Sequence, residues 1–313
     1  MAGSGKTTTP TGWRSLALSI GYVVLFFALL SFALLMLSNY VRDNSSFRLS
    51  RMASGNIHVD ALVAGGSRGV NLMTGRDAAH PPSVFNISYN AQQYPSTLAL
   101  IKAFFRRGNT AKMVLIDAAV FYTHDSNCED KVYWSAYRDL YDAQRADCAS
   151  DATAARFFPL TAFGSEIFLR DLYYLVKRGG DQDWANETTL SPALCSRLSA
   201  KAAGTDAARA ASMDVARNRR DIAALKQWLA SNGYKTKLVF VLAPTLMRQQ
   251  ALPAIRSSEA RAKALFAGED FVDLAQTIGD HCQWYADEVH LSPEGRKVLL
   301  PRILKIIQAR LAP

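Results

Sequence analysis

Two short stretches at opposite ends of the chain hold residues that could together perform nucleophilic catalysis. Asp287 and His290 are three residues apart and directly precede a predicted helix that Ser292 can cap. A carboxylate at this spacing can hold the imidazole in one tautomer and stabilise its charged form. The matching nucleophile is Ser67, which follows a predicted buried strand over 57–64 and two glycines. The pattern predicts a Ser-His-Asp triad that works through an acyl-enzyme.

The position of Ser67 suits a nucleophile for a reason of backbone geometry. A chain that turns sharply from a strand into a helix favours small residues, and Gly65 and Gly66 provide them. The serine then stands at the N-terminus of the helix, where N–H groups and the helix dipole favour a developing negative charge. The alternative is a glycine-rich turn in which Ser67 only caps a helix, and the Asp287/His290 pair is what favours catalysis.

Apolar runs bounded by turn residues predict the elements that would position these side chains. The predicted strands cover residues 57–64, 84–88, 112–118, 237–242 and 271–274, and helices are predicted at 96–105, 165–176, 207–230 and after residue 293. Strands that alternate with helices predict an α/β fold, a three-layer α/β/α sandwich with a parallel sheet of about five strands. Residues 122–206 do not fit another βα unit, so we interpret them as a helical insertion beside the site. We expect its aromatic side chains to fill the insertion's own core; the alternative is that they are exposed and stack on sugar rings.

An uncharged segment near the N-terminus predicts one transmembrane helix. Residues 16–37 provide 22 positions without a charge. As a helix they span about 33 Å, which is enough to cross a hydrocarbon core. The predicted organisation is a polar tail at 1–15, a transmembrane helix at 16–38, a juxtamembrane linker at 39–56 and an α/β domain at 57–313. Charges on the two flanks of the helix do not decide its orientation.

The chain is basic, with a formal net charge of +9. Residues 195–267 contain 13 Lys and Arg against 4 Asp and Glu, so an excess of nine positive charges lies there. A basic face predicts attraction to anionic polymers or phospholipid head groups, and a solvated helix face is the alternative. No nucleic-acid recognition motif accompanies this charge, so we expect no nucleic-acid partner.

Four cysteines indicate the compartment. Cys128, Cys148, Cys195 and Cys282 have no spacing typical of a metal site, and an even count in an exported domain fits disulfides. Cys128–Cys148 is the natural local pair, and the loop it closes would be stabilised by about 3 kcal/mol in the chain-entropy model. Cys195–Cys282 would then tie the insertion to the segment of Asp287 and His290. Free thiols are the alternative.

The small-Gly-Ser turn after the first strand and the Asp-x-x-His before the last helix together resemble the SGNH/GDSL hydrolase superfamily. The resemblance covers roughly residues 59–306. The Gly-Gly-Ser-Arg form is similar to the membrane-anchored branch that handles O-acyl groups on bacterial surface polymers. That branch includes polysaccharide O-acetyltransferases and esterases and D-alanine-transfer accessory proteins.

The resemblance also indicates where an oxyanion would bind. The loop after the second strand would donate a backbone N–H, here at Asn90 or Ala91, without the usual Gly. After the third strand, Asp117-Ala118-Ala119 replaces the usual Gly-x-Asn. A carboxylate cannot donate a hydrogen bond unless it is protonated, so the second donor would have to be Asn90 or Arg68.

We therefore expect a membrane-tethered, extracytoplasmic serine esterase or O-acyltransferase that acts on a cell-envelope or secreted polysaccharide. Its domain would lie in the periplasm or outside a bacterial cytoplasmic membrane, it would need no cofactor or metal, and a membrane-bound acyltransferase or polymer synthase is a candidate partner. The alternative is a non-catalytic scaffold of an exopolysaccharide biosynthesis complex, which the missing oxyanion Asn favours. The complete set of Ser67, Asp287 and His290 favours the enzyme.

Overall fold

A parallel sheet forms the centre of the fold. The computed structural model describes residues 11–44, 52, 55–73, 82–88, 92, 94–122, 176, 189–197, 213–246, 253–279 and 281–312. The strands are β1 (His58–Ala64), β2 (Val84–Asn86), β3 (Thr110–Asp117), β4 (Lys237–Leu242) and β5 (Phe271–Asp273). They lie in the order β2-β1-β3-β4-β5, and every neighbouring pair is parallel. The prediction of an α/β fold with a parallel sheet of about five strands is confirmed.

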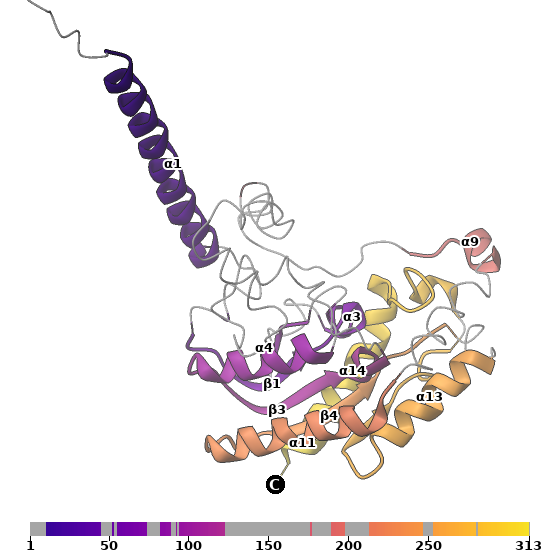
Figure 1. The fold of residues 1–313 in the computed structure, drawn as a ribbon. Helices are drawn as coiled ribbons and strands as arrows, with labels where there is room; N and C mark the ends of the chain where they lie inside the picture. The colour runs from indigo at the N-terminus through magenta and orange to yellow at the C-terminus, as the bar shows by residue number, and fades with distance from the viewer. Residues whose placement is uncertain are drawn as a thin grey trace, which may run out of the picture.

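Helices cover both faces of this sheet, which produces three layers (Figure 1). Successive side chains of β1 point to opposite faces, so Leu62 and Ala64 join one buried cluster and Ala61 and Val63 join the other. The helices are α4 (Tyr94–Arg106), α11 (Val215–Ser231) and α13 (Pro253–Leu265) on the first face, and α3 (Ser67–Leu72) and α14 (Pro293–Leu311) on the second. With both faces buried, the strands need near-continuous apolar runs, as their sequences have.

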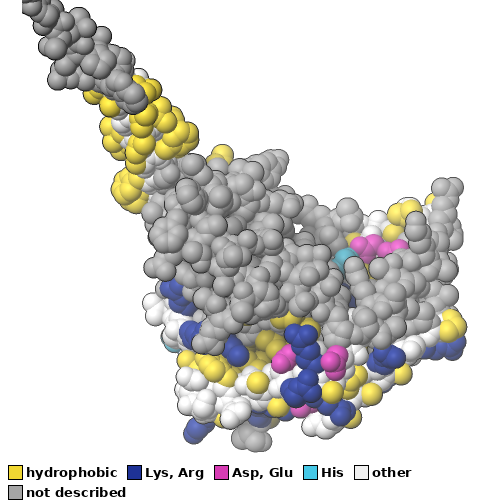
Figure 2. Space-filling view, viewed as in Figure 1, with side chains coloured by type: hydrophobic (Ala, Val, Ile, Leu, Met, Phe, Trp, Pro, Cys, Tyr) yellow, Lys and Arg dark blue, Asp and Glu magenta, His cyan; other side chains and the backbone are white. Residues whose placement is uncertain are grey.

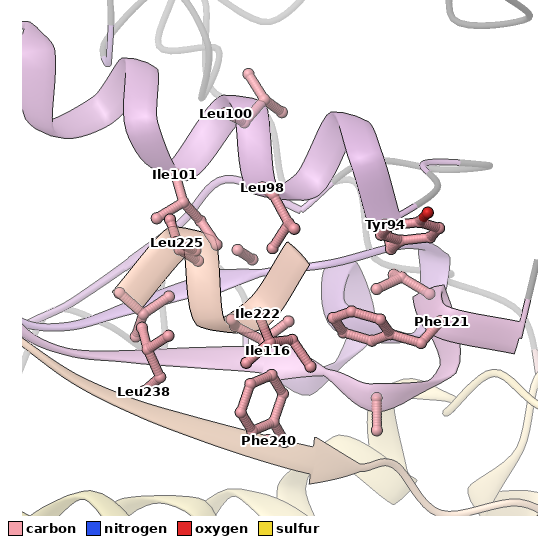
Figure 3. Packing of buried hydrophobic residues seen from close by; sticks show 14 of the residues in the cluster. Tyr94, Leu98, Leu100, Ile101, Ile116, Phe121, Ile222, Leu225, Leu238 and Phe240 are labelled. Carbon is pink, nitrogen blue, oxygen red and sulfur yellow. The ribbon is translucent and has the colours of Figure 1, made fainter. Parts of the chain in front are cut away.

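Aliphatic and aromatic side chains together fill the first cluster, between α4, α11 and the sheet (Figure 3). Phe121 stacks on Tyr94 with ring centroids 5.5 Å apart and meets Phe240 edge-on at 6.0 Å. A polar residue of α11, Asn218, is also buried here, and its Nδ2 donates to the carbonyl of Phe121 at 3.2 Å. This bond explains why the apolar stripe of α11 is interrupted at Asn218.

The start predicted for α11 was wrong. The alanine-rich sequence favoured a helix from residue 207, but α11 begins at Val215. Asp214 sets this start, because its side chain accepts the N–H of Arg217 at 2.9 Å and so caps the first turn. The helix ends near the predicted position, where Gly233 adopts a φ of 78°.

The N-terminal helix is present, but its predicted crossing of a membrane is not supported. α1 (Thr11–Asn44) is helical through the whole predicted segment, and large apolar side chains on it, including Leu18, Tyr22 and Phe26, are exposed (Figure 2). Among the described residues, no helix was found that has both the length and the apolar character needed to span a bilayer.

Much of the predicted insertion at 122–206 lies outside the described residues, including nearly all of the helix predicted at 165–176. The part that is described, residues 189–197, contains α9 (Pro192–Arg197). Its residues Leu190 and Cys195 are buried in the second core cluster. This end of the insertion therefore packs on the same layer as α14.

Candidate active site

The three residues predicted to form a triad come together at the carboxyl end of the sheet. In a sheet of order 2-1-3-4-5, the strand order reverses between the first and third strands, and ligands bind in the crevice outside their carboxyl ends. Ser67 follows β1 after Gly65 and Gly66 and is the first residue of α3. Asp117 ends β3 at the same place. The predicted nucleophile therefore lies where this topology provides a crevice.

His290 connects the other two residues. Its Nε2 lies 2.6 Å from the hydroxyl of Ser67, and its Nδ1 lies 2.6 Å from Oδ2 of Asp287. The other carboxylate oxygen of Asp287 accepts the backbone N–H groups of Val289 and His290, each at 2.9 Å. Asp287 thus orients the imidazole and shapes the loop that carries it. Ser67 and His290 are 223 positions apart in sequence, so the fold itself creates this contact.

One buried aromatic residue anchors the loop before α14 to the end of the sheet. Tyr285 has no exposed surface, and its hydroxyl donates to the carbonyl of Thr245 at 2.9 Å, beyond the end of β4. The chain reverses directly after Tyr285, and the N–H of Ala286 donates to the carbonyl of His290 at 2.8 Å. The triad loop is therefore anchored to the sheet on one side and closed on itself on the other.

A disulfide anchors the same loop to the insertion. Cys195 of α9 is bonded to Cys282, three residues before Tyr285, so this predicted pairing is confirmed. The N–H of Leu190 adds a hydrogen bond to the carbonyl of Tyr285 at 2.7 Å. Cys128 and Cys148, the other predicted pair, lie outside the described residues.

α14 starts directly after the loop and packs tightly against it. Ser292 caps the helix, accepting the N–H of Gly295 at 3.2 Å, as the sequence predicts. A Cβ at Gly295 would overlap the carbonyl of Trp284, so a glycine is required there. The guanidinium of Arg296 reaches Oδ1 of Asn71 in α3 at 3.5 Å, which links α14 to the helix of the nucleophile.

Buried amides hold the helix that begins with Ser67. The side-chain amide of Asn86, at the end of β2, donates to the carbonyls of Gly69 at 2.9 Å and Met73 at 2.7 Å. Asn71 donates to the carbonyl of Ser67 at 2.7 Å. Neither residue is predicted from the sequence, although Asn86 is a polar residue at the carboxyl end of a parallel strand, a position typical of site residues.

The local charges keep Asp287 ionised. Burial alone would raise the pKa of Asp287, but the hydrogen bond from His290, the charge of that ring and the two N–H groups outweigh it, and the pKa lies below its usual value. An ionised Asp287 can stabilise an imidazolium at His290, which is what a general base needs when it takes up a proton.

The structure describes only some of the remaining residues predicted for the site. Asn90 and Ala91 lie outside the described residues. Their neighbour Gln92 is described, and its carbonyl lies 3.2 Å from the position of a Cβ on Gly66. Arg68 is half-buried beside Ser67. In the part of the chain that is described, no group of three or more His, Cys, Asp or Glu side chains could hold a metal ion.

Comparisons with known proteins add little to this geometry. No family model matches the sequence, and no curated protein matches it. Among solved structures, the chain is similar to a Bacteroides fragilis protein provisionally described as an acylhydrolase. The identity is 12% over 80% of this chain and 88% of that chain, with a TM-score of 0.40. A similarity this distant assigns neither a family nor an activity, so a function has to be argued from the site.

Proposed function

We propose that this chain is a serine esterase or O-acyltransferase of the SGNH type, with Ser67 as nucleophile, His290 as general base and Asp287 as the residue that orients it. The observation that carries the proposal is the line of two 2.6 Å contacts from Ser67 through His290 to Asp287. Nucleophile, base and orienting carboxylate at hydrogen-bonding distance are the signature of an activated serine.

Each step of the proposed reaction uses a group of this site. Ser67 Oγ attacks the carbonyl carbon of an acyl ester while its proton passes to Nε2 of His290. The tetrahedral intermediate collapses, the bond to the alcohol breaks, and the alcohol leaves with the proton from His290. Water or a sugar hydroxyl then attacks the acyl-Ser67 ester and gives its proton to His290. The serine is regenerated and the acid or the new ester is released. Esterase and transferase differ only in this last acceptor.

The developing oxyanion would be stabilised by backbone N–H groups. The N–H of Ser67 lies at the start of α3, where such groups have no partner within the helix. The loop around residues 90–92 would supply the second donor. Support comes from Gln92, the described residue of this segment, whose carbonyl lies 3.2 Å from the position of a Cβ on Gly66.

The proposed substrate is an O-acylated polysaccharide of the cell envelope, and the proposed compartment lies outside the cytoplasm. The Cys195–Cys282 disulfide supports an oxidising compartment. Attachment to a membrane through α1 belongs to the same proposal; it is supported by the exposed apolar side chains of that helix, although no described helix meets the requirement for spanning. Separating the membrane fraction from the soluble fraction for the full chain and for a variant lacking residues 1–41 tests this attachment.

Hydrolysis of a chromogenic acetyl ester by the full chain tests the proposed chemistry. We expect turnover that Ser67→Ala and His290→Ala both abolish, because each removes one partner of the 2.6 Å contact. An active Ser67→Ala variant would contradict the assignment of the nucleophile. A folded wild type that neither turns over the ester nor reacts with a serine-directed probe would favour the scaffold hypothesis.

A further inference from the structure

A buried carboxylate beneath the nucleophile has no place in the triad chemistry. Asp117 is the last residue of β3, and its side chain is 1% exposed. β1 and β3 pair through Ala64 and Ile116, so the residue that follows each of these, Gly65 and Asp117, also lie side by side. A Cβ on Gly65 would overlap the Cβ of Asp117. The turn leading to Ser67 therefore rests directly on this aspartate.

The carboxylate of Asp117 faces backbone N–H groups. It accepts the N–H of Ala119 at 3.0 Å. The N–H groups of Gly66 and Gly69, on either side of Ser67, also act to lower its pKa, and its Oδ2 lies 3.9 Å from the position of a Cβ on Gly66. The residue before α3, Gly66, has no side chain with which to cap the helix. Asp117 supplies from a neighbouring strand the acceptor that an N-cap Ser or Asp would normally provide.

We propose that Asp117 is a positioning residue for the nucleophile: by binding the N–H groups of Gly66 and Gly69, it holds the turn so that Ser67 Oγ faces Nε2 of His290. This inference rests on the proposed function of Ser67 and adds the residue that fixes its geometry. It also gives a role to the carboxylate in Asp117-Ala118-Ala119, the segment found in place of the expected Gly-x-Asn after β3. The carboxylate faces the backbone of the turn that leads to Ser67.

The electrostatics indicate that an ionised Asp117 does not stabilise the fold. Burial raises the pKa of Asp117, although the charge of Arg68 and the three N–H groups act in the opposite direction. A carboxyl group whose pKa is raised on folding costs folding free energy as the pH rises above its ordinary pKa, and the cost is complete above the raised pKa. Replacing Asp117 with Asn removes this free-energy cost. It also leaves at least one of the N–H groups without an acceptor.

Asp60 provides a matched control at the other end of the same sheet. It also bridges neighbouring strands, and its Oδ2 accepts the N–H of Ser83 at 2.9 Å. In contrast to Asp117, its pKa is lowered, chiefly by the hydrogen bond from Lys112, so its ionised form stabilises the fold. Replacing Asp60 with Asn makes the same chemical change far from Ser67: it removes the ion pair with Lys112, while the amide oxygen can still accept the N–H of Ser83.

The test compares the full chain with its Asp117→Asn and Asp60→Asn variants. We expect Asp117→Asn to lower kcat on a chromogenic acetyl ester, and the rate of fluorophosphonate labelling at Ser67, by about ten- to a hundredfold with little change in KM. Asp60→Asn keeps kcat, because its ion pair with Lys112 is largely exposed and far from Ser67. A wild-type kcat in Asp117→Asn, or kcat and melting temperature falling in parallel in both variants, would overturn the proposal.

Amide hydrogen exchange separates this proposal from the proposed function. If the wild type neither turns over ester nor takes up the probe, the proposed function fails, and exchange at Gly66 and Gly69 still reports on positioning. We expect exchange at these two amides to be about tenfold or more faster in Asp117→Asn, with the rest of α3 less affected. Equal exchange in the variant and the wild type would overturn the positioning role.

Discussion

Replacing Asp287 with Asn should disable the base while leaving the loop intact. The amide oxygen of Asn can still accept the N–H groups of Val289 and His290, now bonded at 2.9 Å. The amide nitrogen, however, would face Nδ1 of His290 in place of the acceptor now at 2.6 Å. Because that nitrogen only donates, Nδ1 must become the acceptor and the ring proton moves to Nε2. His290 then points a proton at Ser67 and cannot remove one.

The expected loss follows from this change of tautomer. An imidazole held in the wrong tautomer lowers kcat by about 10³- to 10⁴-fold, which corresponds to roughly 4–5.5 kcal/mol of barrier. The side chain of Asp287 is 41% exposed, so we expect the melting temperature to change little. The assay is kcat/KM on a chromogenic acetyl ester at neutral pH.

Glu288→Gln is the control for this replacement, because it makes the same change of charge one residue further along the loop. The backbone carbonyl of Glu288 accepts the N–H of Leu246 at 3.1 Å, and a change of side chain leaves this contact in place. We expect its kcat/KM to match the wild type. An Asp287→Asn variant within about tenfold of the wild type, or equal losses in both variants, would refute the proposed role of Asp287.

Three further predictions concern the support of the site. Gly295→Ala should destabilise the fold by about 1–3 kcal/mol and lower activity, because the added Cβ overlaps the carbonyl of Trp284; thermal melting and ester hydrolysis measure the two effects. Reducing Cys195–Cys282, which are 87 positions apart, should cost about 4–5 kcal/mol in the chain-entropy model, and denaturant titration with and without reductant measures it. The lowered pKa of Asp287 means that its contribution to stability is present above about pH 4 and is lost as the pH falls through that lowered pKa. Acid titration of stability should therefore show a smaller loss in Asp287→Asn, and identical curves would contradict this reasoning.

The sequence was sufficient to predict the elements of the sheet. All strands found lie within two residues of the predicted ones, because strands buried on both faces require apolar runs that a periodicity analysis detects. The start of α11 was missed for a local reason. Helix propensity favoured the alanines before residue 214, and the capping contact of Asp214 decided the start instead.

The sequence also predicted that Ser67, Asp287 and His290 would lie together, because the end of the first strand and the loop before the last helix meet at one edge of such a fold. It could not show what supports them. The contacts of Asp117 and Asn86 with the turn of Ser67 join residues between 17 and 51 positions apart, and a single sequence contains no signal for their geometry. The same holds for Tyr285. In the sequence it resembles any other core aromatic, and only the fold shows that its hydroxyl anchors the loop.

The most direct test of the central claim is to map the residue of the full chain that reacts with a fluorophosphonate probe. If Ser67 is the nucleophile, we expect stoichiometric labelling of Ser67, seen by mass spectrometry of the digested protein. We also expect labelling to be lost in Ser67→Ala and strongly slowed in His290→Ala, because the base 2.6 Å away is what activates the hydroxyl. Labelling of another serine, or labelling of Ser67 that is independent of His290, would contradict the account.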